Sequence, residues 1–367
     1  MASEQNNPRA ALADAGRVVV KIGSRSLITN GGRFETVATQ IAGLWSRGIK
    51  TVLVSSGAIA VGFPRLGLTE RPTSMADLQA SAAAGQSRLM HAYEEAFAPH
   101  GLEVAQVLLT HSGLADLDRY LNARAALDAL VGRGVVPIIN ENDVVSVEEI
   151  QFGDNDQLAA MVATLTGAEA LVLLTDVEGL LDRDGKRVSL VSDVDAVKGL
   201  AKPHEEGVST GGMPSKLEAA RRASLRGVPV AIADARDATV LERLFNGEDV
   251  GTLVLPHGAP LASRKHWIAY TLKPRGALVV DAGAAKAVLE AKGGLLPSGI
   301  VGVRGAFAQG EAVSIVDSEG REIARGLTRY GIEDIAKIAG ARGSDIEKIL
   351  GRSAGDAVVH RDDLVVL

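Results

Sequence analysis

In the stretch Val135-Val136-Pro137-Ile138-Ile139-Asn140-Glu141-Asn142-Asp143, an apolar run ends abruptly in amide and carboxylate side chains. An apolar run between turn residues is typical of a strand buried on both faces of a parallel sheet. The polar residues then lie at the carboxyl end of the strand, where open α/β sheets bind their ligands.

Predicted strands and helices alternate on both sides of this stretch. Helical spacing or composition predicts helices near 34–48, 75–97, 120–130, 156–165 and 216–225. The predicted strands are 17–22, 51–54, 103–110, 135–139, 170–175 and 229–233. Alternation of this kind predicts a three-layer αβα domain with a mostly parallel central sheet.

The pattern changes toward the C-terminus. Turn-rich segments around 255–260 and 273–276 precede short β-like runs. The first residues are polar and lack the apolar core of a secretion signal. We therefore expect a disordered tail (1–14), an α/β domain (15–262), a linker (263–275) and a small β-rich domain (276–367).

The composition excludes several classes of function. The chain has no cysteine, so disulfides, thiolate catalysis and zinc–thiolate sites are excluded. The net charge of −6 provides no electrostatic basis for general binding to nucleic acids or anionic membranes. No apolar run approaches the roughly 20 residues of a membrane span, and we expect a cytoplasmic protein.

Two lysines accompany glycine turns. Lys21 ends the first predicted strand before Gly23-Ser24, and the loop 210–216 supplies glycine amides, a hydroxyl and Lys216. Such groups can hold phosphate oxygens, as can the turn at Ser55-Ser56-Gly57-Ala58 before a helix. The alternatives without a function remain open: Lys21 could be a surface lysine, and the glycines could form plain turns. Neither a P-loop motif nor a G-x-G-x-x-G dinucleotide motif after the first strand is present.

A cluster of amides and acids is the most informative group, and it comprises Asn140, Asn142, Asp143, Asp154, Asn155 and Asp156. The second triplet is also a credible cap for the helix that follows. Amide and acid groups at a strand end suit an amino-acid substrate. If the side-chain carboxylate of such a substrate accepts a phosphoryl group, its pKa of about 4.3 means that it is already ionised at pH 7, so no residue has to act as a general base. Lysines and a metal ion would then stabilise a moving phosphoryl group, and we expect Asp156 to hold the two lysines in position.

A set of short motifs extends over nearly the whole chain: Lys21-Ile22-Gly23-Ser24, Ser56-Gly57-Ala58-Ile59-Ala60, Gly85-Gln86-Ser87-Arg88-Leu89, Leu121-Asn122-Ala123-Arg124, 139–143, Gly153-Asp154-Asn155-Asp156, Leu174-Thr175-Asp176, 210–216 and the C-terminal His360-Arg361-Asp362-Asp363. In these motifs and their order, the sequence resembles the glutamate 5-kinase family. The resemblance implies an amino acid kinase fold followed by a PUA domain. It implies ATP-dependent phosphorylation of the L-glutamate side-chain carboxylate to L-glutamyl 5-phosphate, the first step of proline biosynthesis, with Mg²⁺ and with proline as an inhibitor.

The resemblance also implies roles for individual residues. Lys21 would contact the ATP phosphates and Lys216 the transferring phosphoryl group. The expected glutamate site consists of Ser56, Gly57, Asn140, Asp143 and Asn155. The expected nucleotide site consists of Lys21, Gly23, Ser24, Thr175, Asp176, Thr210, Gly211, Gly212, Met213, Pro214, Ser215 and Lys216. No residue is expected to bind a metal ion directly.

Two features depart from the family pattern. Arg25 follows Ser24 where a small hydroxyl residue is usual, and the loop 201–209 is short. The alternatives are another amino acid kinase (for N-acetylglutamate, carbamate, aspartate or a nucleotide) and an RNA-binding protein with a ligand-sensing kinase-like domain. RNA binding is disfavoured because residues 276–367 hold 11 lysines and arginines against 13 aspartates and glutamates. A homo-oligomer and transfer of the labile product to glutamyl phosphate reductase are further expectations.

Overall fold

The computed structural model describes residues 7–28, 33–146, 155–201, 212–257, 265, 268, 272–290 and 293–367. The chain divides into two compact units, Met1–Pro260 and Leu261–Leu367, each with its own sheet and core. The expected limits at residues 262, 263 and 275 remain predictions. In the described part of the chain, no helix combines the length and the hydrophobicity of a membrane span.

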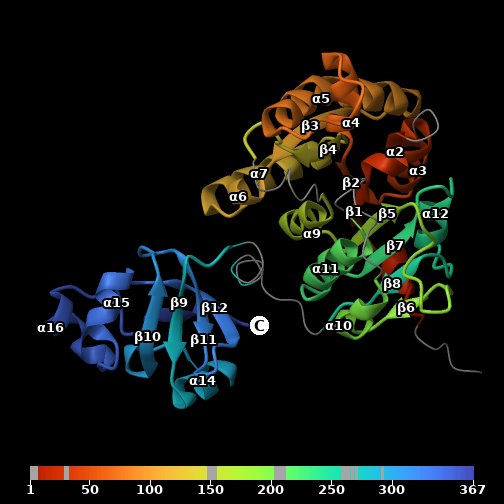
Figure 1. Cartoon of the computed structure of the whole chain (residues 1–367). Helices are drawn as coiled ribbons and strands as arrows, with labels where there is room; N and C mark the ends of the chain where they lie inside the picture. Colours follow the sequence, from red (N-terminus) through yellow and green to blue (C-terminus); the bar gives the residue numbers. More distant parts are fainter. Residues whose placement is uncertain are drawn as a thin grey trace, which may run out of the picture. The chain divides into compact units, whose positions relative to one another are not determined.

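Eight described strands form the sheet of the first unit, in the order β3-β4-β2-β1-β5-β7-β8-β6 (Figure 1). All neighbours pair in parallel except β7 and β8. Strands β4 and β5 are buried along their whole length, which explains their nearly continuous apolar sequence. The strands are β1 Arg17–Ile22, β2 Lys50–Ser55, β3 Val104–Leu109, β4 Val136–Glu141, β5 Ala170–Thr175, β6 Leu190–Val191, β7 Val230–Asp234 and β8 Thr252–Val254.

Helices cover both faces of this sheet, which confirms the predicted three-layer fold. Helices α7, α9 and α11 form one layer, in which α9 contacts both β1 and α11. Helices α3, α5 and α12 form the other layer. The described helices of this unit are α1 Ala10–Ala13, α2 Ser24–Ile28, α3 Phe34–Ser46, α4 Ala58–Gly62, α5 Met75–Phe97, α6 His111–Leu114, α7 Leu117–Gly132, α9 Asn155–Thr166, α10 Val194–Val197, α11 Met213–Ser224 and α12 Val240–Phe245.

The expected disordered tail is wrong for residues 7–14, which include helix α1. Arg9 is only 4% exposed and donates hydrogen bonds to the Val250 carbonyl at 2.7 Å and to Asp249 Oδ1 at 2.7 Å. Leu12 is fully buried in the core of the unit. A polar composition predicted a solvated tail, but the donors of Arg9 find their acceptors far away in the sequence. Residues 1–6 lie outside the described part of the chain.

The second unit is a five-stranded sheet in its described part, in the order β10-β9-β11-β12-β13, which confirms the β-rich C-terminal domain. Its core includes Leu278, Ile315 and Tyr330. The strands are β9 Gly276–Val280, β10 Ile300–Gly305, β11 Ala312–Val316, β12 Glu322–Thr328 and β13 Val359–Val366. The described helices are α14 Ala282–Leu289, α15 Ile332–Ile338 and α16 Ile346–Leu350.

Candidate active site

Four adjacent strands bring the predicted site residues to one edge of the sheet. Strand β1 lies between β2 and β5, and β4 pairs with the other side of β2. In this register Ile22 is opposite both Ser55 and Leu174. The carboxyl ends of these parallel strands therefore deliver the polar side chains to one edge, as the sequence predicts.

Asp156 lies between the ammonium groups of Lys21 and Lys216. The Lys21 Nζ atom is 2.6 Å from Asp156 Oδ1, and the Lys216 Nζ atom is 2.9 Å from Asp156 Oδ2. The two lysines are 4% exposed and the aspartate is fully buried. Burial raises the pKa of the Asp156 carboxyl group, but the two ammonium groups outweigh it and hold this pKa below its ordinary value. Asp156 is therefore ionised and paired at neutral pH.

The three charged residues come from three different elements. Lys21 is on β1, Asp156 is in the first turn of α9, and Lys216 is in the first turn of α11. The N-terminal end of a helix favours a carboxylate such as Asp156. Proline near the start of α11 suits the first helical turn. Gln157 Nε2 donates to the Ser215 carbonyl at 3.2 Å, which connects the starts of the two helices.

A hydrogen-bonded amide cluster lies at the ends of β2 and β4. The Asn155 Nδ2 atom donates to the Ser55 carbonyl at 2.7 Å, Ser56 Oγ at 2.9 Å and Asn140 Oδ1 at 2.8 Å. The Asn140 Nδ2 atom donates to Gln86 Oε1 at 2.9 Å. The structure thus brings together three of the residues predicted to bind an amino acid.

Gly57 is the N-cap residue of helix α4, directly after this cluster, and its φ of 115° is a conformation that favours glycine. Helix α4 then packs closely against α5. A Cβ atom on Gly85 would lie 1.8 Å from the Ala58 carbonyl oxygen, and one on Gly62 would lie 1.8 Å from the Ser81 carbonyl oxygen. The two glycines allow α5 to approach the edge where the amide cluster lies.

The predicted nucleotide residues occupy the neighbouring strand ends. Gly23 and Ser24 follow β1, and Thr175 and Asp176 lie at the end of β5. Arg25 Nη1 is 3.2 Å from Asp176 Oδ2. Burial raises the pKa of Asp176, but its hydrogen bonds, including that from Arg25, outweigh burial and lower the pKa overall. Arg25, which stands where the family usually has a small hydroxyl residue, therefore places a cation among the expected nucleotide residues.

The remaining predicted residues are placed as follows. Asp143 lies in the turn directly after β4. Gly212, Met213, Pro214 and Ser215 form the start of α11. Asp154, Thr210 and Gly211 lie outside the described residues, as does most of the short loop 201–209.

Sequence reasoning assigned no role to two residues of α5 that contact the site. Gln86 accepts a hydrogen bond from Asn140, and the Tyr93 hydroxyl lies 2.8 Å from Ser55 Oγ. Burial raises the pKa of Tyr93, so its hydroxyl remains neutral. The two residues are seven positions apart and share one face of the helix. That spacing is a signal in the sequence, but it is equally typical of a core-facing helix.

Acidic and histidine side chains do not gather into a metal-binding group of three or more in the part of the chain that the structure describes. Mg²⁺ is usually bound by one or two carboxylates together with substrate phosphates and waters.

Comparison with known proteins confirms the resemblance. The amino acid kinase family model matches residues 16–234, and the PUA domain model matches residues 276–350. A glutamate 5-kinase of Pelobacter propionicus is 48% identical over 96% of this chain and 97% of its own length. Those of Chromohalobacter salexigens and Myxococcus xanthus are also 48% identical, over 100% and 98% of both chains. The chain therefore belongs to the amino acid kinase family and, within it, to the glutamate 5-kinases.

Proposed function

We propose that this enzyme transfers the γ-phosphoryl group of ATP to the side-chain carboxylate of L-glutamate, as the names of its relatives indicate, and so begins proline biosynthesis. The observation that carries the proposal is the buried Lys21–Asp156–Lys216 group at the carboxyl edge of the sheet. These three side chains have a combined charge of +1. A buried cationic site with fixed geometry favours the developing negative charge of a phosphoryl group in transfer.

Each of the three residues has a separate task in this proposal. Lys21 contacts the phosphates of ATP, and Lys216 stabilises the phosphoryl group as it moves. Asp156 is a positioning residue, because its two carboxylate oxygens contact one ammonium group each. The lowered pKa of Asp156 keeps it ionised. The glutamate side chain is itself ionised at pH 7, so the transfer needs no general base.

The amide cluster and its neighbours bind glutamate in this proposal. Ser56, Asn140 and Asn155 are hydrogen-bonded together, and Gly57 and Asp143 follow the same two strand ends. Carboxylate and amide oxygens can accept from the α-ammonium group, while amide and hydroxyl hydrogens can donate to the carboxylates.

The adjacent strand ends bind ATP. The proposed nucleotide residues are Lys21, Gly23, Ser24, Thr175, Asp176 and residues 210–216. Mg²⁺ fits this site as an ion carried by the nucleotide. The described residues include no cluster of acidic side chains that would bind it independently. When bound, the ion neutralises part of the phosphate charge.

Regulation, assembly and location complete the proposal. Proline presents a carboxylate and an ammonium group like glutamate, so it can compete for the same polar groups as a feedback inhibitor. The acyl phosphate product is labile, which favours its direct transfer to glutamyl phosphate reductase. We also propose that the enzyme is a homo-oligomer. We further propose a cytoplasmic enzyme whose PUA domain serves structure or assembly rather than RNA binding. That domain has a net charge of −2 over residues 276–367.

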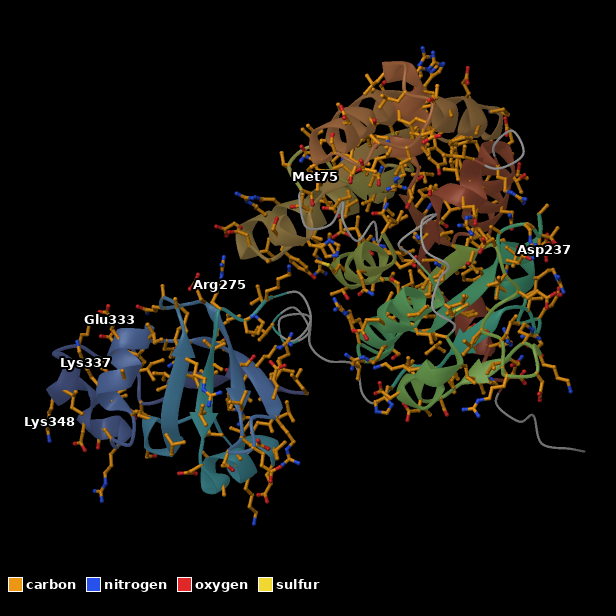
Figure 2. The ribbon with its side chains drawn as sticks, in the orientation of Figure 1. Met75, Asp237, Arg275, Glu333, Lys337 and Lys348 are labelled. Atoms are coloured by element: carbon orange, nitrogen blue, oxygen red, sulfur yellow. The ribbon has the colours of Figure 1, made fainter. Side chains whose placement is uncertain are left out.

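Trapping of the product with hydroxylamine tests the reaction and the site together. The wild type should form a hydroxamate that depends on L-glutamate, ATP and Mg²⁺, and Lys216→Ala should reduce the rate at least about 100-fold. Lys337→Ala is the matched control, because Lys337 is exposed on α15 (Figure 2). Equal rates for the wild type and Lys216→Ala would refute the site, whereas activity on another acceptor only would refute glutamate as substrate.

A further inference from the structure

Gln86 is a residue of the Gly85-Gln86-Ser87-Arg88-Leu89 motif for which the proposed function has no role. It lies on α5, and its Oε1 atom accepts a hydrogen bond from Asn140 Nδ2 at 2.9 Å. Among the described residues, its buried Nε2 atom has no hydrogen-bond partner. The hydrogen bond from Asn140 is therefore the side-chain interaction through which Gln86 can act on the site.

A contact with the backbone shows which end of the Asn140 amide is the oxygen. The Glu141 N–H group donates to Asn140 Oδ1 at 2.9 Å, and a peptide N–H can only donate. The oxygen of Asn140 must therefore face Glu141, and its NH₂ group must face Gln86. Gln86 in turn must present its oxygen.

A second backbone contact shows which end of the Asn155 side-chain amide is the NH₂ group. Its Nδ2 atom donates to the Ser55 carbonyl at 2.7 Å, and a carbonyl can only accept. The same Nδ2 atom is also 2.9 Å from Ser56 Oγ and 2.8 Å from Asn140 Oδ1, so its two hydrogens are shared among three acceptors. Ser56 Oγ is thus an acceptor inside the cluster, and its own hydrogen is left to donate elsewhere. The Oδ1 atom of Asn155 takes no part in these three contacts.

We propose that Gln86 is a positioning residue for the glutamate site, acting through Asn140 on Asn155 and Ser56. This relay presents the Ser56 hydroxyl as a donor for a substrate carboxylate and Asn155 Oδ1 as an acceptor for the α-ammonium group. The proposal rests on the proposed function, because it assumes that these two residues contact glutamate.

The requirement on Gln86 is an acceptor, not a particular charge. Methionine has nearly the same length but offers Asn140 Nδ2 only a weak sulfur acceptor. Glutamate supplies acceptor oxygens, whereas lysine supplies donors alone. Charge alone predicts the opposite order of the KM values for L-glutamate, because glutamate at position 86 would repel the anionic substrate and lysine would attract it.

Steady-state kinetics of four variants tests the relay. We expect Gln86→Met and Gln86→Lys to raise the KM for L-glutamate about ten-fold, the loss of roughly one hydrogen bond to an ionised group. The KM for ATP should stay within two-fold. Gln86→Glu should have a lower KM for glutamate than Gln86→Lys. Arg88→Met, at an exposed position of the same helix, should match the wild type.

Three results would overturn the relay. They are an unchanged KM for glutamate in Gln86→Met, a higher KM for Gln86→Glu than for Gln86→Lys, and parallel increases of both KM values with a lowered melting temperature. Asn155→Ala separates this failure from failure of the proposed site. A normal KM for glutamate in Asn155→Ala refutes the glutamate site itself, whereas a raised KM there with a normal Gln86→Met refutes the relay alone.

Discussion

The Lys21 Nζ atom lies 2.6 Å from Asp156 Oδ1, although the two residues are on different elements and both are buried. The second oxygen of the same carboxylate is 2.9 Å from Lys216 Nζ. One carboxylate thus holds two cations that would otherwise repel each other. Breaking a buried ion pair is costly because it leaves uncompensated charge in a poorly solvated place.

Asp156→Asn should therefore damage both activity and stability. We expect hydroxamate formation to fall at least about 100-fold and the free energy of unfolding to fall by about 3 kcal/mol. Urea denaturation with the kinetic assay measures both quantities. Asp195→Asn is the control, because it removes an exposed pair with Lys198 whose loss should cost under about 1 kcal/mol. Wild-type activity in Asp156→Asn would show that the two lysines need no common counter-ion.

Gly85→Ala should destabilise the protein, because its Cβ atom would lie 1.8 Å from the Ala58 carbonyl oxygen. Helices α4 and α5 would have to separate, at a cost of about 1–3 kcal/mol or more. Gly43→Ala in helix α3 is the matched control, since nothing lies within 4 Å of its added Cβ atom. That change should stabilise the helix by about 0.5–1 kcal/mol. Thermal unfolding of both variants tests the contrast, and equal melting temperatures would contradict close packing of the two helices.

Arg25→Ser should alter ATP use in preference to glutamate use. The Arg25 guanidinium contacts Asp176, and both lie among the expected nucleotide residues. Removing it takes away a cation beside the proposed phosphate site and the arginine partner of the Asp176 carboxylate. We expect the KM for ATP to rise about 3–10-fold, as for one ordinary hydrogen bond at a partly exposed position, while the KM for glutamate stays within two-fold. A change confined to the KM for glutamate would place Arg25 in the other site.

Asp249 should make stability depend on pH in the acid range. Hydrogen bonds from Arg187 and Ser189, together with the nearby charge of Arg9, lower its pKa to about 2. Since the pKa of aspartate in the unfolded chain is about 3.9, this stabilisation is present above pH 4. It is lost as the pH falls from about 4 to about 2. The melting temperature should fall less steeply over this window in Asp249→Asn than in the wild type, and parallel curves would contradict the prediction.

Local sequence patterns predicted most of the sheet correctly. The first strand and the fifth have the predicted limits, because β-branched and apolar residues stop there at polar turns. Strands β6 and β8, with two and three residues, were missed because so short a run has no detectable period. Helix α1 was missed because the partners of Arg9 lie about 240 residues away.

Periodicity, turn residues and motifs are local properties of the chain, so the α/β class, the family and the residue types of the site could be predicted from the sequence. The contact of one Asp156 carboxylate with both lysines became visible in the folded chain. The same holds for the hydrogen bond from Asn140 to Gln86 and for the contact between Arg25 and Asp176. Strand order and helix packing bring these atoms together across 54 to 151 positions, and no local sequence pattern specifies contacts over such separations.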